Sequence, residues 1–268
     1  MSVSEYPIEL KTASSAALLL GLLAPGPARA TVRLHPLVSD HMVLQRNQPL
    51  PIWGWAAPGE AVRVTFWGRE YPATTGGTDG KWTVTPPATA AGGPYTLRVK
   101  GRNGLTIADV LVGDVWLASG QSKMEWPVRN AANAAAEITA ADYPTIRRID
   151  VPNMPALRPQ AGFGGAGWQR CSPQMVGDFS AVAYFFARDL HRPDPKVSIG
   201  LITAEWGGTP AEAWTSGPAL RAHPDFAARA AAQEAATGTI RAQQAASPAW
   251  PRSAPARPAW TRAGAPAS

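Results

Sequence analysis

The residue of this sequence best suited to chemistry is a serine in a tight turn after a hydrophobic strand. Residues 110–118 are almost continuously apolar, and the chain then passes through Ser119, Gly120 and Gln121 to Ser122. A strand that ends in a sharp turn of small residues exposes a serine hydroxyl and leaves backbone N–H groups free to face an oxyanion. The pattern predicts Ser122 as the nucleophile of a hydrolase. A serine that only forms the turn is an equal alternative on this pattern alone.

A serine hydroxyl is a poor nucleophile until a base takes its proton. The sequence has four histidines, and a surface or packing role suits each of them better than catalysis: His35, His41, His191 and His223. Cys171, the single cysteine, has no nearby histidine in sequence and is interpreted as a structural residue. The base for Ser122 is therefore not evident in this chain.

Metal and cofactor chemistry finds no support in the sequence. One cysteine allows no intramolecular disulfide and no Cys/His zinc cluster. Asp40 and His41 alone are too sparse for a metal site. We therefore expect no metal and no cofactor.

The net charge of +6 raises the question of a nucleic-acid partner. The positive excess is almost entirely arginine spread along the chain, without the Lys/Arg run that marks a nucleic-acid arm. The composition therefore argues against nucleic-acid binding.

The first 30 residues resemble a secretory signal peptide. A short apolar run, residues 16–24, is followed by small residues that end at Ala28 and Ala30, and it is too short to span a membrane. Glu5 and Glu9 are atypical of such a segment. The pattern predicts a secreted or periplasmic protein without a membrane span.

Residues 31–108 are predicted to form a small antiparallel β-sandwich, because short β-branched and aromatic runs alternate with Gly/Pro/Asp turns. The predicted strands are 32–34, 42–44, 50–55, 61–66, 81–85 and 95–99.

Residues 109–226 change to an α/β pattern. Two apolar strands, 110–118 and 197–203, flank predicted helices at 130–141 and 179–191, the second capped by Ser180. Strand, helix and strand with short connections indicate a parallel sheet, of which only part is recognisable. Residues 227–268 are rich in Ala, Pro, Arg and Gln and are predicted to be a low-complexity disordered tail.

Three long blocks resemble the sialate O-acetylesterase family: residues 119–127 (SGQSKMEWP), 179–186 (FSAVAYFF) and 200–216 (GLITAEWGGTPAEAWTS). Shorter matches extend the resemblance over roughly residues 34–226, among them 37–46 (LVSDHMVLQR) and 51–59 (PIWGWAAPG).

The resemblance implies an N-terminal β-sandwich followed by the first part of an SGNH-type α/β hydrolase domain. The activity it implies is removal of acetyl groups from O-acetylated sugars, either sialic acids or xylan-type glycans. Ser122 then matches the family nucleophile. Gln121, Gly207 and Gly208 match positions that bind the oxyanion or the substrate, although the glycine pair on its own suggests an ordinary turn.

Three departures from the family pattern affect this interpretation. Lys123 stands where the family carries Asn, and Glu205 stands where a small polar residue is usual. A carboxylate that points into an oxyanion site would be unfavourable. The family's base lies in an Asp-x-x-His setting near the end of a much longer chain, and no such setting occurs here, so the resemblance indicates a truncated esterase.

Two hypotheses remain open. The leading one is an acetylesterase homologue that carries a serine nucleophile but lacks the Asp/His region. The alternative is a non-catalytic carbohydrate-binding fragment or an inactive product, in which tryptophans of the sandwich stack on sugars: Trp53, Trp55, Trp67 and Trp82. A row of exposed tryptophans would favour binding, and buried ones would not.

Overall fold

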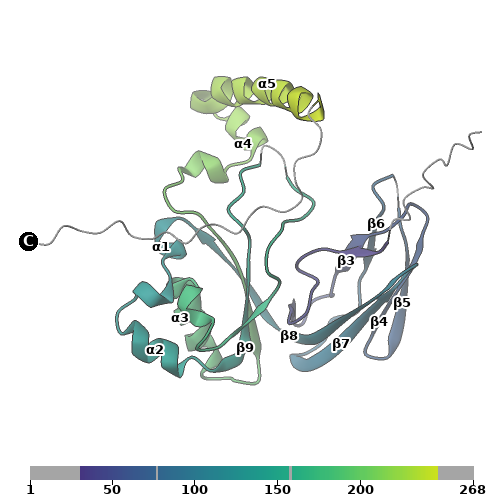
Figure 1. Cartoon of the computed structure of the whole chain (residues 1–268), viewed down its shortest axis with the longest axis vertical. Coiled ribbons are helices and arrows are strands. Elements are labelled where there is room, and N and C mark those ends of the chain that lie inside the picture. The colour runs from purple at the N-terminus through teal and green to yellow at the C-terminus, as the bar shows by residue number, and fades with distance from the viewer. Residues whose placement is uncertain (1–30, 77, 157–158, 247–268) are drawn as a thin grey trace, which may run out of the picture.

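A computed structural model describes residues 31–76, 78–156 and 159–246, and it has the expected α/β architecture with a β-sandwich ahead of it (Figure 1). The sandwich has a three-stranded antiparallel sheet on one side and antiparallel strands of a larger sheet on the other. The first sheet comprises β1 (Arg33–Leu34), β3 (Ile52–Trp55) and β6 (Lys81–Val84). The second contains β4 (Ala61–Phe66), β5 (Arg69–Thr74), β7 (Gly92–Lys100) and the start of β8 (Gly104–Gly120).

Alternating apolar residues form the sandwich core. In β4, Val62, Val64 and Phe66 are buried while Ala61 and Arg63 are exposed. A fully buried side chain of this size contributes about 1.5–3 kcal/mol relative to an exposed one, so this alternation fixes which face of the strand turns inward. The opposite sheet contributes other members of the same core, including Ile52, Trp82 and Val84.

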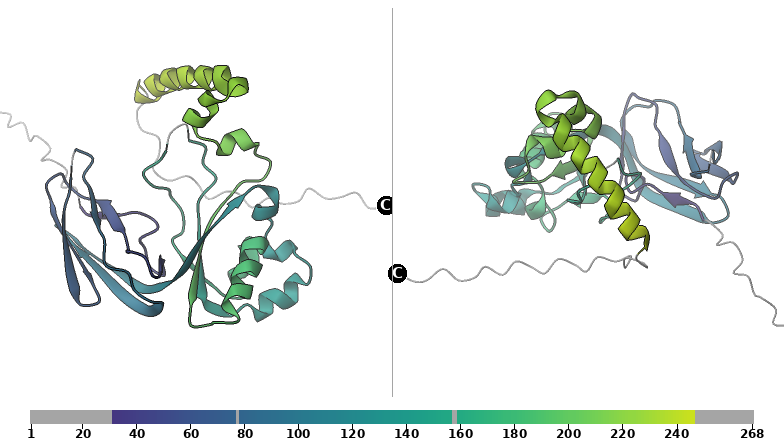
Figure 2. Two further views of the ribbon diagram at one scale, coloured as in Figure 1. Left: turned by 180° about the vertical axis from the view of Figure 1, so that it is seen from behind. Right: turned by 90° about the horizontal axis from the view of Figure 1, so that it is seen from above.

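The long strand β8 joins the sandwich to the α/β region, as Figure 2 shows from two further sides. It first pairs with β7 in antiparallel fashion and then, in parallel, with β2 (Val43–Gln45) and β11 (Ser198–Glu205). Next to β11 lies the parallel strand β9 (Tyr143–Asp150), and β10 (Gln169–Cys171) pairs with the other edge of β9 in antiparallel fashion. The eight-stranded sheet thus runs through both regions, and the predicted boundary between residues 108 and 109 falls inside β8.

Helix α3 (Ala181–His191) covers one face of the parallel strands. Ser180 caps it as predicted, because its Oγ accepts a hydrogen bond from Ala183 N at 3.2 Å. Ala183, Tyr184 and Ala187 pack against buried strand residues such as Leu201. The opposite face of the same strands meets the sandwich core through Ile149 and Ile202.

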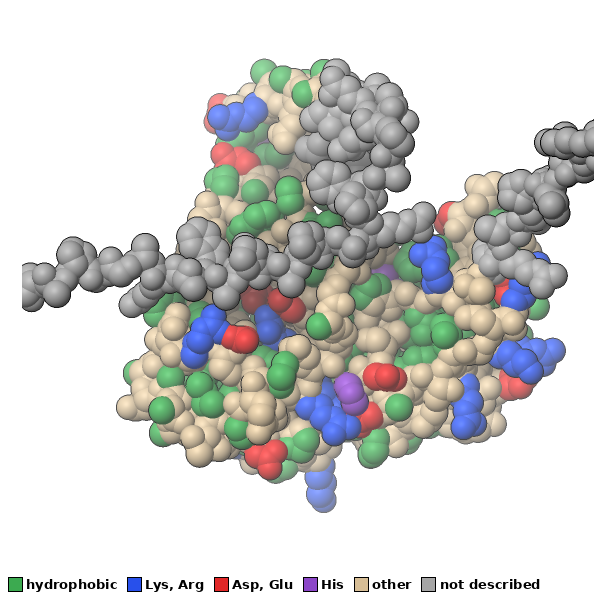
Figure 3. All heavy atoms as spheres, in the orientation of Figure 1, with side chains coloured by type: hydrophobic (Ala, Val, Ile, Leu, Met, Phe, Trp, Pro, Cys, Tyr) green, Lys and Arg blue, Asp and Glu red, His purple; other side chains and the backbone are tan. Residues whose placement is uncertain are grey.

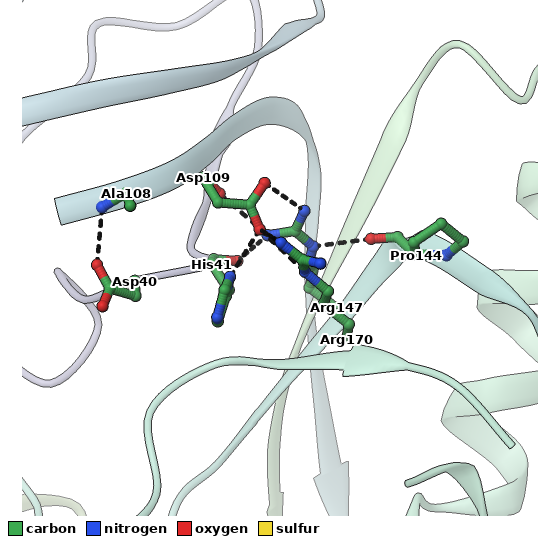
Figure 4. A network of polar contacts seen from close by, with 7 residues as sticks. All are labelled: Asp40, His41, Ala108, Asp109, Pro144, Arg147 and Arg170. Carbon is green, nitrogen blue, oxygen red and sulfur yellow. Dashed lines mark hydrogen bonds and ion pairs between the residues drawn. The ribbon is translucent and has the colours of Figure 1, made fainter. Parts of the chain in front are cut away.

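The joint between the two regions is a polar network around Asp109 (Figure 4). Asp109 adopts a left-handed φ of 57° where the β7–β8 register shifts. Its carboxylate lies 2.6 Å from His41 Nδ1 and accepts hydrogen bonds from Arg147 (3.0 Å) and Arg170 (2.6 Å). The Arg147 guanidinium also donates to the carbonyls of His41, Asp109 and Pro144. A β-bulge bends the strand here, and Arg147 binds the backbone that the bulge frees.

Several predicted boundaries need correction. The Ala-rich helix predicted over 130–141 is confined to α2 (Ala134–Ala140), preceded by a 3₁₀ turn at Val128–Asn130. Two further helices are α4 (Gly217–Ala222) and α5 (Pro224–Ala246), so the disorder predicted from residue 227 is wrong as far as Ala246. The reason is that alanine is the strongest helix former, and α5 also packs against α4, where Ala230 is buried.

The other predictions for the chain ends lie outside the described residues. These are the signal peptide at 1–30 and the tail at 247–268. Among the helices described, none has both the length and the apolar character needed to cross a membrane. On the face seen in Figure 3, Lys and Arg side chains are scattered among acidic ones and do not form a basic surface.

Candidate active site

The turn predicted to expose Ser122 is present. Strand β8 ends at Gly120, and helix α1 (Ser122–Glu125) begins two residues later, with Ser122 and Gln121 exposed. The turn is tight at Gly120, where a Cβ atom would lie 3.1 Å from the Cβ of Met124. Ser122 is an exposed residue, and its Oγ forms no hydrogen bond with any residue that the structure describes.

The glycine loop after β11 lies beside this turn because β8 and β11 are parallel and in register. Glu205 pairs with Gly120, and Trp206 N donates to Gly120 O at 3.0 Å. A Cβ atom at Gly207 would collide with Glu125 Oε2 and would lie 3.5 Å from Ser122 Oγ. The backbone of Gly207 therefore lies within van der Waals reach of the serine, and a side chain at this position would displace the Glu125 carboxylate.

The amide of Gly207 is engaged in this structure. Gly207 N donates to Glu125 Oε2 at 2.7 Å, and Asn153 Nδ2 lies 3.4 Å from Glu125 Oε1. The carboxylate thus binds the N–H group that the family resemblance assigns to the oxyanion. Gly208, with φ of 76°, is exposed and has no hydrogen-bond partner among the described residues.

Glu125 is a site residue that the sequence reasoning missed. The available signal was its position three residues after Ser122, which places both side chains on the same face of a helical turn.

A buried carboxylate lies under the turn. Glu205 is only 8% exposed, and its Oε2 has no hydrogen-bond partner among the residues described. Burial raises the pKa of Glu205 to about 7; Arg148, 3.7 Å away, opposes the shift, while Asp150 and Glu125 add to it. Glu205 therefore points into the protein beside the site, the orientation that would disfavour a nearby oxyanion when the carboxylate is ionised.

The guanidinium of Arg148 is committed to several partners. It donates to Thr203 Oγ1 at 3.0 Å and lies 2.9 Å from Asp150 Oδ1, closer than its 3.7 Å distance from Glu205. It also lies over the Phe179 ring, 5.3 Å from the centroid. One arginine thus faces two carboxylates, and Glu205 is the less well paired of them.

A hollow of about 310 Å³ opens next to the serine. It lies between the end of β8 and the 3₁₀ turn Ala211–Trp214. Its lining residues are Ser119, Gly120, Gln121, Thr209, Ala211 and Trp214.

None of the four histidines is bonded to Ser122. His35 is buried against Trp53, with ring centroids 5.0 Å apart, and burial lowers its pKa. His191 is bonded to Thr145 Oγ1 at 2.7 Å, and His223 is an exposed residue between α4 and α5.

The His41–Asp109 pair resembles the acid and base of a catalytic triad but lies elsewhere in the molecule. Asp109 and Gly120 are eleven residues apart on β8. At about 3.3 Å per residue the two ends of that segment are roughly 30 Å apart, even with the bulge. His41 therefore cannot take a proton from Ser122.

Two other candidate residues are also placed. Lys123 is exposed on α1 and forms no hydrogen bond or ion pair with the described part of the chain. Cys171 is buried, and burial raises the pKa of its thiol to about 12, so it is not a thiolate nucleophile at neutral pH. Within residues 31–246, apart from the three undescribed ones, no group of three or more His, Cys, Asp or Glu side chains could hold a metal ion.

The sandwich tryptophans do not form an exposed row. Trp82 is 1% exposed, and Trp53, Trp55 and Trp67 are half-buried. Trp53 and Trp67 pack against the core, and Trp55 lies under the Arg33 guanidinium. The exposed tryptophans of the described chain are in the α/β region: Trp116, Trp126 and Trp214.

Comparison with known proteins identifies relatives of the chain. No family model matches the chain. Sialate O-acetylesterases from Pongo abelii and Homo sapiens are 33% and 32% identical to it over 230 residues, which cover 76% of this chain and 44% of each relative. The crystal structure of a carbohydrate acetylesterase from Xanthomonas citri matches with a TM-score of 0.68 and 42% identity, covering 71% of this chain and 44% of that one.

The chain therefore spans less than half the length of these relatives. Within that span the fold of the chain is similar to that of the solved acetylesterase. The chain belongs to the sialate O-acetylesterase family.

Proposed function

We propose that this chain carries the nucleophile and an oxyanion element of a serine-dependent acetylesterase that acts on O-acetylated carbohydrates. The observation that carries the proposal is the proximity of Ser122 to Gly207, since a Cβ at Gly207 would lie 3.5 Å from Ser122 Oγ. A serine esterase needs its nucleophile close to a backbone amide, because the hydroxyl attacks the ester carbonyl carbon while the amide N–H stabilises the carbonyl oxygen. The names of the relatives supply the substrate class.

The reaction proceeds in two steps. Ser122 Oγ attacks the acetyl carbonyl carbon and gives its proton to a base. The tetrahedral intermediate then collapses, the sugar leaves as an alcohol after taking up a proton, and an acetyl-serine remains. Water hydrolyses this ester and releases acetate. The acetyl oxygen binds the Gly208 amide, or that of Gly207 once Glu125 has moved away.

The chain's own histidines do not supply the base, so we expect weak activity. Loss of the base from a serine triad leaves a residual acceleration of about 10³–10⁴ over water, which comes from the oxyanion site and binding. Glu125, the carboxylate next to Ser122, is already occupied by Gly207 and Asn153. An added small base can reach Ser122 because this residue is exposed.

The test is hydrolysis of an aryl acetate by the full chain and by the Ser122→Ala variant, with and without imidazole. We expect slow turnover by the parent that rises with imidazole, and neither effect in the variant after the protein-free rate has been subtracted. Circular dichroism of both proteins checks that they are folded. Equal rates in the two folded proteins at every imidazole concentration would exclude Ser122 as the nucleophile.

The absence of a histidine at Ser122 favours the second candidate, a carbohydrate-binding chain without turnover. The buried and half-buried tryptophans of the sandwich argue against that region as the binding surface. Sugar binding that persists in a chain without Ser122-dependent hydrolysis would support this alternative.

A further inference from the structure

The Glu125 carboxylate bridges two loops at the edge of the sheet where Ser122 lies. Strands β8, β9 and β11 are parallel, so their carboxyl ends meet at this edge. Glu125 follows β8, Asn153 follows β9 and Gly207 follows β11. Glu125 Oε2 accepts a hydrogen bond from Gly207 N at 2.7 Å, and its Oε1 accepts one from Asn153 Nδ2 at 3.4 Å. Each carboxylate oxygen is therefore bound to a different loop.

This contact puts a negatively charged oxygen on an amide next to the serine. A Cβ atom at Gly207 would collide with Glu125 Oε2 and lie 3.5 Å from Ser122 Oγ, so the carboxylate and the hydroxyl are neighbours of the same glycine. The oxygen of a tetrahedral intermediate is also negatively charged and also accepts from a backbone N–H. One N–H group donates a well-aligned bond to one acceptor at a time. Glu125 and an oxyanion therefore exclude each other at Gly207.

The contact can open without loss of the serine turn. Glu125 is an exposed residue, and both hydrogen bonds of its carboxylate are at the surface, where water competes for each group. Its backbone N–H donates separately to Gln121 O at 3.0 Å. Rotation of the Glu125 side chain therefore frees the Gly207 amide and leaves the backbone bond of α1 in place.

We propose that Glu125 is an autoinhibitory residue: its carboxylate closes the Gly207 amide in the free protein, and a small carboxylate such as acetate, or an acetyl oxygen, must displace it. The part that concerns the acetyl oxygen rests on the proposed function, since it assigns the Gly207 amide to the reaction. A contact that is closed in about 90% of molecules weakens the apparent affinity for a competing anion by about tenfold.

NMR of the Gly207 amide tests the contact itself. Tryptophan precedes three glycines of the sequence, Gly54, Gly68 and Gly207, so ¹³C-carbonyl tryptophan and ¹⁵N-glycine together label three amides in the full chain. Gly207→Ala lacks one of these resonances and so assigns it. A hydrogen bond to a charged acceptor moves an amide proton downfield. We expect Glu125→Ala to move the Gly207 proton upfield and to leave the two sandwich glycines, Gly54 and Gly68, unchanged.

Acetate titration of the same resonance, at constant ionic strength, tests the competition. Glu125→Ala should bind acetate about tenfold more tightly than the parent. Glu125→Gln keeps the shape of the side chain without its charge and should show part of this gain. Asn153→Ala keeps every charge but frees one end of the carboxylate, so it should also show a partial gain. Asp150→Asn removes a carboxylate from the same edge but not from Gly207, and its gain should be much smaller.

The imidazole-assisted hydrolysis of an aryl acetate supplies a third readout. The Ser122-dependent rate should be higher in Glu125→Ala than in the parent. A lower rate would show that Glu125 serves the reaction and would overturn the autoinhibition. An unmoved Gly207 resonance in folded Glu125→Ala and Glu125→Gln would overturn the contact, and a gain from Asp150→Asn equal to that from Glu125→Ala would reduce it to a general charge effect.

Failure of this inference and failure of the proposed function give different results. If the Gly207 resonance and the acetate affinity respond as expected while no variant shows Ser122-dependent hydrolysis, the proposed function fails and the Glu125 contact stands as a closed anion site. If the parent shows Ser122-dependent hydrolysis but Glu125→Ala neither binds acetate more tightly nor reacts faster, the autoinhibition fails and the proposed function stands.

Discussion

At the scale of single residues, Glu205 is a position where folding removes a carboxylate from water and so makes its ionised form less stable. Its carboxyl is buried with one oxygen unpaired, and burial raises its pKa from 4.5 to about 7. Between these two values the folded protein keeps a proton that the unfolded chain has lost. The free energy of unfolding should therefore fall as the pH rises from about 4.5 to about 7, by roughly 3 kcal/mol.

The Glu205→Gln variant should lack this decline, so that it becomes more stable than the parent by up to about 3 kcal/mol at pH 8. Urea unfolding of both proteins at pH 4.5, 6 and 8 measures the difference. Glu70→Gln is the control, because Glu70 is 57% exposed in a surface ion pair and its loss should change stability by less than about 1 kcal/mol. Identical pH dependence of the parent and Glu205→Gln would mean that Glu205 is not held in its neutral form.

The sequence predicts single residues of the site only where a backbone pattern marks them. Ser122 stands out because a strand and a turn precede it, whereas Gly207 is assigned only by the family resemblance, since a glycine pair after a strand suggests an ordinary turn. The Gly207 amide is engaged because the Glu125 side chain adopts a rotamer that points its carboxylate toward Gly207, 82 positions away in the chain. No local pattern reports such a rotamer choice, so the engagement of the amide could be found only in the structure.

At the scale of elements, helix α3 depends on its N-terminal cap. Ser180 is 2% exposed and accepts from Ala183 N, so alanine there would leave a buried helix donor without an acceptor. We expect Ser180→Ala to lower the free energy of unfolding by about 1–2 kcal/mol. Ser216 is the matched control, since it caps the short helix α4 from an exposed position through a 3.4 Å bond.

Ser216→Ala should lower the free energy of unfolding by less than half of the loss that Ser180→Ala causes. Thermal unfolding of the two variants next to the parent makes the comparison, and a larger loss from Ser216→Ala would contradict it.

Elements were predictable where one periodicity dominated. The apolar spacing of 179–191 predicts α3, and the apolar run of 110–118 predicts the buried part of β8. Strand β9 was missed because Arg147 and Arg148 interrupt its apolar pattern, yet both are buried through ion pairs and carbonyl contacts. An arginine in a sequence pattern indicates a solvent-facing position. Here both arginines can be buried because they form ion pairs with Asp109 and Asp150, which the sequence pattern does not reveal.

At the scale of the whole molecule, one polar joint holds the two regions together. The Arg147 guanidinium is 3% exposed and reaches the sandwich through the carbonyls of His41 and Asp109 while its backbone belongs to β9. Burial alone would raise the pKa of Asp109, but hydrogen bonds from Arg147, His41 and Arg170 lower it from 3.8 to about 2. The ionised form of Asp109 is therefore stabilised by folding.

This joint predicts how the molecule unfolds in acid. Because the folded pKa is depressed, the stabilisation is fully present above about pH 4 and is lost as the pH falls toward 2; a shift of this size corresponds to about 2 kcal/mol. Asp109→Asn leaves a buried guanidinium without its counter-ion and should lower the free energy of unfolding by about 3–5 kcal/mol at pH 7.

Urea unfolding at pH 7 and pH 2.5, followed by both fluorescence and circular dichroism, tests the joint. The deficit of Asp109→Asn should shrink at the lower pH, where the parent carboxyl is partly protonated. Arg170→Met removes a partner of the same carboxylate that is 50% exposed, so its deficit should stay near 1 kcal/mol or less. If Asp109→Asn costs no more than Arg170→Met, the two regions are held by apolar packing, and Arg147 contributes little to their union.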